Sequence, residues 1–340
     1  MPVGTMPMNP LIVDTDGGVD DAQALMMLIA GGRPPMAITT LFGNVSLQQA
    51  TDNVLATLAI ARADIPVHMG ADKPLKQATV DARQIHGEDG LGGVARPDVT
   101  ARPASDDAIG FLVETLVKAA ASDEKVDLLM IGPMTNLARA IAIDPVIIQG
   151  LGQLTIMGGT LHGRGNTTPA AEFNVFADPE AAKIVFAARI RTIMVPWEPC
   201  MHHKITGPAY EACMADLPDT PQKRFMTGLA AHARTVTQGY GHPDVFRFVD
   251  PFAAAVALDP SIVTSSIEAS VDVSLAEGIT RGMTVVDPTG RLGTPPVTLV
   301  ETGDVEAMTK MLVAAVGYDP VAKCPLWNEG AAKPFLGATA

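Results

Sequence analysis

Between residues 11 and 195 the chain alternates short apolar runs with longer helical stretches, and this alternation restricts the fold more than any other feature. The first pair is the apolar run at 11–13 and the stretch at 22–30, which is rich in Ala, Leu and Met. Continuous apolar runs of this length are typical of strands that are buried on both faces. Strands that alternate with helices form a parallel sheet covered on both sides. The sequence therefore predicts an α/β fold with a mostly parallel central sheet flanked by helices.

The remaining elements follow from the same pattern. The expected strands lie at 11–13, 37–42, 66–69, 126–131, 154–157 and 192–195, and the expected helices at 22–30, 48–61, 108–120, 134–142 and 179–188. After Pro196 the pattern changes to a helical insertion at 221–240, a helix at 251–258, an antiparallel pair at 267–275 and 281–287, and a last helix at 305–316. Because there is no internal repeat and no low-complexity linker, we expect a single domain over 1–340, with a helical lid insertion at about 220–242 above the active site.

Composition narrows the class of protein. The 340 residues carry a formal net charge of −13, which argues against binding to nucleic-acid polymers or anionic membranes, since both need clustered Lys and Arg. The apolar runs are too short to span a membrane, and residues 1–10 lack the features of a secretory signal, so we expect a cytoplasmic location. The three cysteines, Cys200, Cys213 and Cys324, are too scattered for a disulfide framework or a thiolate zinc site.

Four carboxylates lie within eight positions where the first strand is expected to turn into the first helix: Asp14, Asp16, Asp20 and Asp21. In open α/β sheets, ligands bind outside the carboxyl ends of the strands. A helix N-terminus favours negative charge, but it cannot stabilise four like charges. A hard divalent cation held by oxygen ligands can do so. The segment therefore predicts a metal site at the edge of the sheet.

Other interpretations of these aspartates are weaker. A helix N-cap explains one carboxylate and leaves three. An EF-hand loop that began at Asp14 would need Gly and Glu at its sixth and twelfth positions, which hold Val19 and Leu25. A phosphohydrolase with Asp14 or Asp16 as nucleophile fits the Asp-x-Asp pattern, but the segment has no neighbouring Lys or Arg to bind a phosphate.

Polar and glycine-rich clusters follow several other predicted strands. They are Gly43-Asn44, the segment 85–93 around His86, the segment 132–136, and Gly158-Gly159 leading to 165–174. Together they supply amides, a carboxylate and an imidazole, which suit the vicinal hydroxyls of a sugar better than a phosphate. Taken singly, Asn44 could be a turn residue, and Thr135 with Asn136 could cap a helix.

The order and spacing of these motifs, from about residue 11 to 260, closely resemble the inosine–uridine preferring nucleoside hydrolase family. The resemblance rests on DTDGGVDDA at 14–22, GN at 43–44, HG at 86–87, GPMTN at 132–136, MGG at 157–159 and EFN at 172–174. It implies a Rossmann-like nucleoside hydrolase fold and a tightly bound Ca²⁺. It also implies hydrolysis of the N-glycosidic bond of a ribonucleoside to ribose and free base, by a homodimer or homotetramer.

The same resemblance implies roles for single residues. The expected Ca²⁺ ligands are Asp16, Asp21, the backbone carbonyl of Thr135, and Asp250. The expected ribose-binding residues are Asp20, Asn44, Met157, Asn166, Glu172 and Asn174. Asp16 is also expected to be the general base, because Ca²⁺ acidifies water less strongly than Zn²⁺ does and the attacking water needs a proton acceptor. Asp14 is expected to support the ligand residues from behind.

The chain departs from the family pattern beside the last metal ligand. Some members carry His there, to protonate the leaving base, and others carry an aromatic residue that stacks on it, whereas this chain has Val249. The proton donor must be another group or solvent; the candidates are His86, His202, His203, His232, Tyr240 and His242. Trp197 could stack on the base or pack in the core. We expect base contacts from His86, Trp197, His232 and Tyr240, and a lid that contains His232, Arg234 and Tyr240.

The sequence thus predicts a Ca²⁺-dependent hydrolase of purine or inosine/uridine-type ribonucleosides. A pyrimidine-preferring or modified-nucleoside hydrolase of the same family is the alternative within this class. A non-catalytic nucleoside- or ribose-binding protein is the alternative from another class. The presence of Asp16 and Glu172 argues against the binding protein, because binding alone needs no group that activates water.

Overall fold

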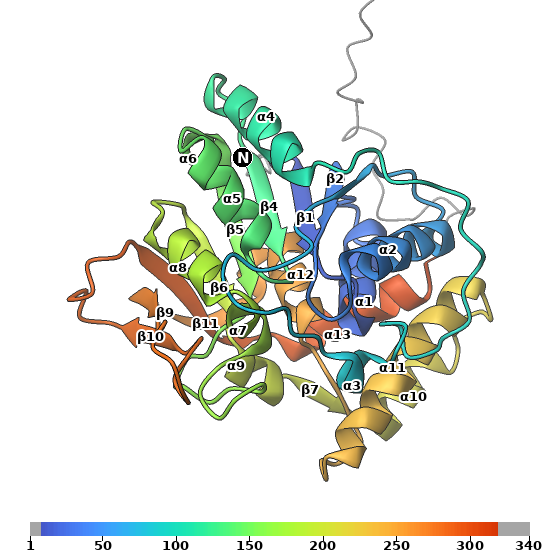
Figure 1. The fold of residues 1–340 in the computed structure, drawn as a ribbon. Coiled ribbons are helices and arrows are strands. Elements are labelled where there is room, and N and C mark those ends of the chain that lie inside the picture. The colour runs from blue at the N-terminus through green and yellow to red at the C-terminus, as the bar shows by residue number, and fades with distance from the viewer. Residues whose placement is uncertain (1–7, 319–340) are drawn as a thin grey trace, which may run out of the picture.

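A nine-stranded sheet forms the centre of the computed structural model, which describes residues 8–318 (Figure 1). Its strands are β1 (Leu11–Thr15), β2 (Ala37–Thr40), β3 (Val67–Met69), β4 (Val126–Met130), β5 (Leu151–Met157), β6 (Thr192–Val195), β9 (Val263–Val273), β10 (Thr284–Asp287) and β11 (Pro296–Gly303). Their order in the sheet is β10-β9-β11-β6-β5-β4-β1-β2-β3. All pairings from β3 across to β11 are parallel, while β9 pairs antiparallel with both β11 and β10. The predicted mostly parallel sheet with a small antiparallel extension is confirmed.

Helices cover both faces of this sheet. Before β6 they are α1 (Val19–Ala30), α2 (Leu47–Ala61), α3 (Arg83–His86), α4 (Ala108–Ala120), α5 (Thr135–Ile143), α6 (Ile147–Gly150), α7 (Phe173–Ala177) and α8 (Pro179–Ala187). After β6 they are α9 (Trp197–His202), α10 (Gly207–Met214), α11 (Pro221–Gly239), α12 (Asp250–Leu258), the short 3₁₀ helix η1 (Pro260–Ile262) and α13 (Val305–Val316).

Two apolar cores lie on opposite faces of the sheet, and β1 contributes to both. Leu11 and Val13 pack into the core that includes α1, α12 and α13, whereas Ile12 packs into the core that includes α4, α5 and α8. Successive side chains of a strand point to opposite faces, so a continuous apolar run is what a strand covered on both sides requires. Helix α1 is buried along nearly its whole length, between α2, α11, α12 and α13. The aspartate segment therefore lies at the centre of the molecule.

The observed boundaries differ from the predicted ones in a few places. The second strand ends at Thr40, because Leu41 and Phe42 turn away to bond the carbonyls of Thr15 and Ala71. The fifth strand begins at Leu151, three residues earlier than expected. The sequence analysis missed β11, which inserts between β6 and β9 and brings the C-terminal part of the chain back to the parallel sheet.

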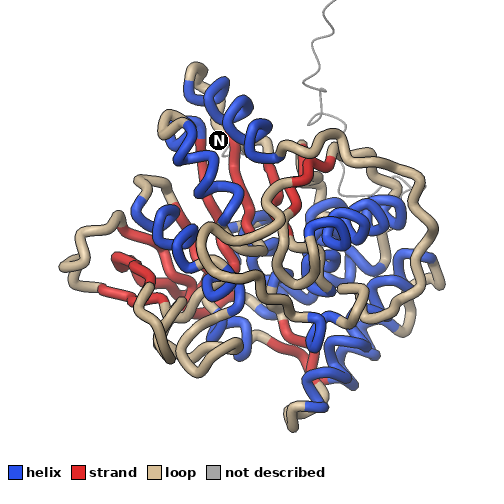
Figure 2. The backbone as a smooth tube through the Cα atoms, viewed as in Figure 1, coloured by secondary structure: helices blue, strands red, loops and turns tan. Residues whose placement is uncertain are grey.

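Irregular segments and a small two-stranded sheet surround the carboxyl ends of the parallel strands. This second sheet pairs β7 (Lys204–Thr206) antiparallel with β8 (Val245–Arg247), and α10 and α11 lie between these two strands in the sequence. A long, mostly irregular stretch between β3 and α4 crosses the front of the molecule and carries α3 (Figure 2). Helix α11, at the place of the predicted helical insertion, packs against α3. Two segments far apart in sequence thus meet on this side of the sheet.

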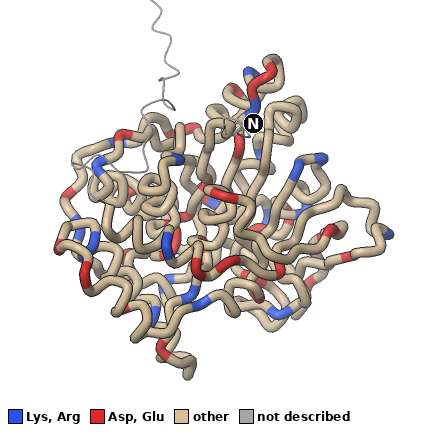
Figure 3. Tube along the Cα trace, turned by 180° about the vertical axis from the view of Figure 1, so that it is seen from behind, with Lys and Arg blue, Asp and Glu red and all other residues tan. Residues whose placement is uncertain are grey.

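Lys and Arg positions are dispersed among Asp and Glu positions along the described trace (Figure 3). Within residues 8–318, no helix combines the length and the apolar character that a membrane crossing needs.

Candidate active site

Asp14 ties the end of β1 to the neighbouring strands. It is completely buried, and its Oδ1 accepts hydrogen bonds from the Thr39 hydroxyl on β2 and from Asn136 Nδ2 at 2.7 Å. Asn136 Oδ1 in turn accepts from the backbone N–H of Ala71 at 2.9 Å. Burial raises the pKa of Asp14 to about 7. Oδ1 of Asp14 is thus used within the protein, whereas its buried Oδ2 has no hydrogen-bond partner among residues 8–318.

Asp16 and Asp21 share the amide of Asn44. Asn44 Nδ2 donates to Asp16 Oδ1 at 2.8 Å and to Asp21 Oδ2 at 3.1 Å, and the backbone N–H of Asn44 donates to Asp16 Oδ2 at 2.8 Å. A Cβ atom on Gly43 would lie 2.0 Å from Asp16 Oδ2, so a glycine is required for this close approach. The Gly43-Asn44 pair is therefore more than a turn, because it orients two buried carboxylates.

Asp21 also stabilises the start of α1. Its Oδ2 accepts from the backbone N–H of Gly18 at 2.8 Å, and its Oδ1 accepts from the Thr15 hydroxyl. Gly18 is the N-cap of α1, and Asp21, the third residue of the helix, bonds back to its N–H as in a capping box, beside the contact of Asp21 with Asn44. Capping therefore uses part of the hydrogen-bonding capacity of Asp21 and does not account for the other three carboxylates of the segment.

Three carboxylates converge between α1 and α12. One oxygen from each of Asp20, Asp21 and Asp250 lies within 4.8 Å of the other two. Asp21 and Asp250 are buried, and the Asp20 side chain is 22% exposed. Oδ1 of Asp20 has no hydrogen-bond partner among the described residues. Within residues 8–318, no Lys or Arg forms an ion pair with these groups, and clustered carboxylate oxygens of this kind fit a hard divalent cation.

Electrostatic repulsion supports the same conclusion. Burial raises the pKa of Asp250 well above its usual range, and the nearby carboxylates Asp20, Asp21, Asp16 and Glu172 raise it further. Burial also raises the pKa of Asp16, with Asp21 as the next cause, and it raises the pKa of Asp20 to about 6. Each charge makes the next one more costly. A bound cation would offset this repulsion and keep all of these groups ionised.

Three predicted ribose-binding residues meet at the end of β5. Glu172 is buried and caps α7: its Oε1 accepts from Asn174 N–H at 2.9 Å, and its Oε2 accepts from Gly159 N–H at 2.7 Å and from Val175 N–H at 3.2 Å. Asn174 Nδ2 donates to the backbone carbonyl of Met157 at 3.1 Å. Burial raises the pKa of Glu172 to about 7, and Asp20 lies close enough to raise it further. Glu172 is therefore within electrostatic range of the aspartate cluster.

The other predicted metal and sugar residues lie in different settings. Thr135 is buried at the start of α5, where its hydroxyl donates to Asp178 Oδ2 at 2.7 Å. Asn166 lies on an exposed loop, and its Oδ1 accepts from the Thr167 hydroxyl. Within residues 8–318, Asn166 forms no hydrogen bond with the buried cluster.

His86 is the predicted base-side residue that lies closest to the cluster. It is buried, its Nδ1 accepts from the backbone N–H of Val19 at 3.1 Å, and Nδ1 lies 3.6 Å from Asp20 Oδ1. Burial lowers the pKa of His86 to about 4, so the ring is neutral at neutral pH and carries its proton on Nε2. Beside it, His232 of α11 donates from Nε2 to the Ile85 carbonyl at 2.9 Å. Helix α11 thus rests on the segment that carries His86.

The remaining base-side candidates do not join this group. The ring nitrogens of His203 are bonded to the Pro199 carbonyl and the Gly303 N–H, and Trp197 is half-buried against the core. Tyr240 follows the last residue of α11 and is 62% exposed. Three further candidates also lie apart: His202 and His242 are exposed, and Arg234 pairs with Asp244 and Glu211. Val249 packs half-buried against the core, so the position before Asp250 offers no donor.

Two buried carboxylates of the site region were missed by the sequence analysis. Asp178 accepts from the Thr135 hydroxyl, Leu75 N–H and Ala181 N–H, and its Asp-Pro sequence before α8 is a recognisable cap signal. Glu198 accepts from three backbone N–H groups between 161 and 164, and no local pattern predicts this contact.

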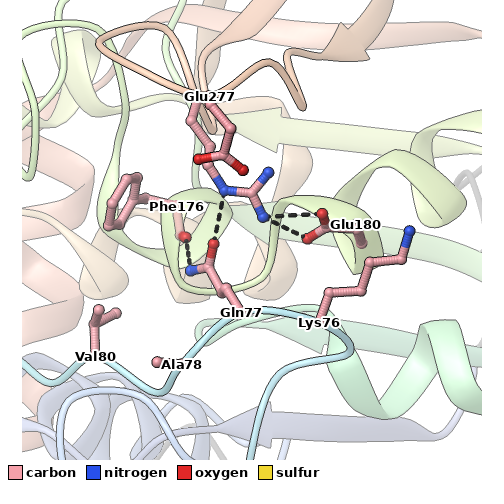
Figure 4. Close-up of a pocket in the computed structure, with 8 residues that line it drawn as sticks. Lys76, Gln77, Ala78, Val80, Phe176, Glu180 and Glu277 are labelled. Carbon is pink, nitrogen blue, oxygen red and sulfur yellow. Dashed lines mark hydrogen bonds and ion pairs between the residues drawn. The ribbon is translucent and has the colours of Figure 1, made fainter.

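A separate surface pocket of about 440 Å³ lies beside α7 and α8 (Figure 4). Gln77 donates from Nε2 to the Phe176 carbonyl at 2.7 Å and accepts from Arg281 Nε at 3.0 Å. The Arg281 guanidinium also donates to both carboxylate oxygens of Glu180 at 2.9 Å. These polar groups are paired with one another, so the wall of the pocket tethers the segment that leads to His86.

Comparison with known proteins adds to the geometry. A family model described as inosine-uridine preferring nucleoside hydrolase matches residues 11–310. The inosine-uridine preferring nucleoside hydrolase of Leishmania major is 33% identical over 82% of this chain and 87% of its own length. The pyrimidine-specific ribonucleoside hydrolase RihA of Enterobacter sp. (strain 638) is 35% identical over 85% of this chain and 91% of its own. The structure of a plant nucleoside hydrolase superposes with a TM-score of 0.83 at 30% identity, covering 92% of this chain and 100% of the other.

Proposed function

Because the chain belongs to the inosine-uridine preferring nucleoside hydrolase family and is a nucleoside N-ribohydrolase, we propose that its hydrolysis of ribonucleosides depends on Ca²⁺ bound at the buried aspartate cluster. The observation that carries the proposal is the approach of Asp20, Asp21 and Asp250 to within 4.8 Å, with no cation of the described chain paired to them. The full proposed ligand set is Asp16, Asp21, Asp250 and the backbone carbonyl of Thr135: Asp21 and Asp250 belong to the cluster, Asp16 shares the Asn44 amide with Asp21, and Asp20 of the cluster is assigned to the ribose. When bound, Ca²⁺ would supply positive charge that acidifies water and attracts sugar hydroxyls.

We assign Asp16 as the general base. Two donors of Asn44 hold one oxygen each of the Asp16 carboxylate, and each oxygen keeps one further lone pair, so that one oxygen can bind the cation and the other can accept from the attacking water. As the water adds to the sugar carbon and the bond to the base breaks, Asp16 takes the proton. The pairing with Asn44 supports this role because a fixed carboxylate loses little freedom when it binds the water.

Ribose would lie between α1 and the end of β5. Among residues 8–318, Oδ1 of Asp20 has no hydrogen-bond partner and can accept one from a sugar hydroxyl, and three backbone N–H groups hold the Glu172 carboxylate in place. Asn44, Met157, Asn166 and Asn174 complete the proposed ribose set. Positive charge develops on the sugar ring in an oxocarbenium-like transition state, and buried carboxylates next to the ring stabilise it.

The leaving base would lie on the side of His86 and α11. The Val19 N–H occupies Nδ1 of His86, so the proton on Nε2 can be donated to an acceptor atom of the base. His232, Tyr240 and Trp197 are further proposed contacts on this side. A neutral imidazole donates a hydrogen bond more readily than a whole proton, and we therefore assign the final protonation of the base to solvent.

The test is base release from a panel of purine and pyrimidine ribonucleosides, measured before and after treatment with EDTA and after readdition of CaCl₂. We expect release from inosine and uridine, loss of activity in EDTA and recovery with CaCl₂. Activity that is unchanged in EDTA would refute the metal dependence. No release from any nucleoside would refute the hydrolase assignment, and phosphate release from a monoester would favour a phosphohydrolase instead.

We propose a preference for purine and inosine/uridine-type nucleosides, with pyrimidine or modified nucleosides as the alternative that the same panel tests. We also propose that the chain forms a homodimer or homotetramer and acts as a single domain. Light scattering after size-exclusion chromatography would measure the number of subunits, and a monomeric mass would refute the oligomer.

A further inference from the structure

The loop at 158–172, which carries Asn166, is closed at its base by Glu172. Gly159 N–H donates to Glu172 Oε2 at 2.7 Å and joins the two ends of the loop. The Thr284 side chain of β10 holds the next residue, because Thr160 N–H donates to Thr284 Oγ1 at 2.7 Å and Thr284 Oγ1 donates to the Thr160 carbonyl at 2.7 Å. The base of the loop is therefore fixed against the sheet.

The tip of this loop folds on itself. The backbone N–H groups of Asn166, Thr167 and Thr168 all donate to the Ala171 carbonyl, at 3.1–3.3 Å. A Cβ atom on Gly165 would lie 2.1 Å from the same carbonyl oxygen, so Gly165 permits this packing. Residues 165–171 are thus a small unit held by its own hydrogen bonds. Its position depends on the irregular segment 161–164, which connects it to the fixed start of the loop at Gly159 and Thr160.

Glu198 of α9 accepts three hydrogen bonds from that connecting segment. Oε2 accepts from Leu161 N–H at 2.7 Å, and Oε1 accepts from His162 N–H at 2.9 Å and from Arg164 N–H at 3.1 Å. Glu198 is 8% exposed and forms no ion pair with any Lys or Arg of residues 8–318. A buried carboxylate without a counter-ion is costly, and three charge-assisted hydrogen bonds from the backbone offset that cost.

We propose that Glu198 is a positioning residue for the reaction: it clamps residues 161–164 so that the loop tip presents Asn166 to the ribose. The inference rests on the proposed function, since it needs Asn166 to contact the sugar. Glu198 acts through the loop and does not itself touch the substrate. Its loss leaves three backbone N–H groups without an acceptor and frees the tip to move relative to Glu172.

The first test compares Glu198→Ala and Glu198→Gln with the wild type. We expect Glu198→Ala to lower kcat/KM by at least about tenfold, because a misplaced binding group costs orientation in the transition state. Glu198→Gln keeps one acceptor oxygen and should lose less. In the double variant with Asn166→Ala, the Glu198→Ala change should add little, since both changes remove the same contact. Fully additive losses would overturn the proposal.

A second readout does not depend on activity. Arg164 is an exposed trypsin site within the segment 161–164 that Glu198 holds. We expect trypsin to cleave after Arg164 faster in Glu198→Ala than in the wild type. Asp287→Ala is the matched control: Asp287 accepts from Thr289 N–H and Leu292 N–H in an exposed turn that contains Arg291. It should speed cleavage after Arg291 and leave kcat/KM unchanged.

Several outcomes would overturn the proposal. Unchanged cleavage after Arg164 in Glu198→Ala would refute the clamp. Faster cleavage with unchanged kcat/KM would show that the clamp has no role in the reaction. If Glu198→Ala failed to fold, as judged by circular dichroism, Glu198→Gln would carry both measurements. A wild type that released no base would instead refute the proposed function and the catalytic part of this proposal, whereas the trypsin result would still test the clamp.

Discussion

Asn44→Ala removes the amide that two carboxylates share, and its effect can be worked out from the geometry. Asn44 Nδ2 lies 2.8 Å from Asp16 Oδ1 and 3.1 Å from Asp21 Oδ2. Laid end to end, these two bonds place the oxygens at most about 5.9 Å apart, where two charges repel by roughly 3 kcal/mol at an effective dielectric constant of about 20. The variant loses both hydrogen bonds and keeps the repulsion.

Asn53→Ala is a matched control. Asn53 is also a buried asparagine whose Nδ2 bridges two acceptors at 2.8 Å, but these are the neutral carbonyls of Gly17 and Asp89. Hydrogen bonds to charged groups contribute about 1.5–3 kcal/mol each and neutral ones about 0.5–1.5 kcal/mol. Without metal, we expect Asn44→Ala to lower the free energy of unfolding by about 3–6 kcal/mol, and Asn53→Ala by about 1–3 kcal/mol.

The assay is urea unfolding followed by circular dichroism, in EDTA and in CaCl₂. A cation beside Asp16 and Asp21 offsets their repulsion, so CaCl₂ should reduce the deficit of Asn44→Ala and leave that of Asn53→Ala unchanged. Equal deficits for the two variants, with no response to CaCl₂ in either, would refute the view that these carboxylates form a charged site for a cation.

Three further predictions address the same site. Asp16→Ala should abolish turnover and leave the circular dichroism spectrum intact, and a near-normal kcat would refute its role as base. Asp250→Ala should lower the calcium content of the purified protein, so unchanged content by atomic emission would exclude it as a ligand. Burial raises the pKa of both Asp14 and Glu172 to about 7, so folding without metal takes up protons between about pH 4 and pH 7, and this part of the stability is lost as the pH rises through that window. The gain in Tm from CaCl₂ should therefore grow from about pH 5 to about pH 7, and a constant gain measured by differential scanning fluorimetry would contradict this.

The sugar side of the site was largely predictable because its residues follow the ends of parallel strands. Asp14 and Asp16 come at the end of β1, and Asn44 follows β2 on the neighbouring strand. The carboxyl ends of adjacent parallel strands lie at the same edge of the sheet, so the order of motifs in the sequence already places these side chains together. The α/β fold followed from the same period of strand and helix.

Contacts between distant segments were not predictable in this way. β11 is an eight-residue strand interrupted by the polar residues Thr298, Glu301 and Thr302, and only its pairing with β6 and β9 shows that it belongs to the sheet. Glu198 has the sequence surroundings of a first-turn helix glutamate, yet its side chain binds a loop more than thirty residues earlier. Local periodicity encodes neither partner.

The side of the site that would hold the leaving base depends on such distant contacts. The sequence could therefore supply candidate residues for this side, but it could not predict which of them lie together. His232 reaches the Ile85 carbonyl across 147 positions of sequence, and through this bond α11 lies beside His86. Tyr240, which follows the last residue of α11, is exposed, and Val249, which precedes α12, packs half-buried against the core. A neutral His86 can donate one hydrogen bond from Nε2, but it lacks the second ring proton that an imidazolium would transfer to the leaving base. Under the proposed mechanism, catalysis in this chain draws most of its stabilisation from the sugar side, where the buried carboxylates lie, and less from activation of the leaving base.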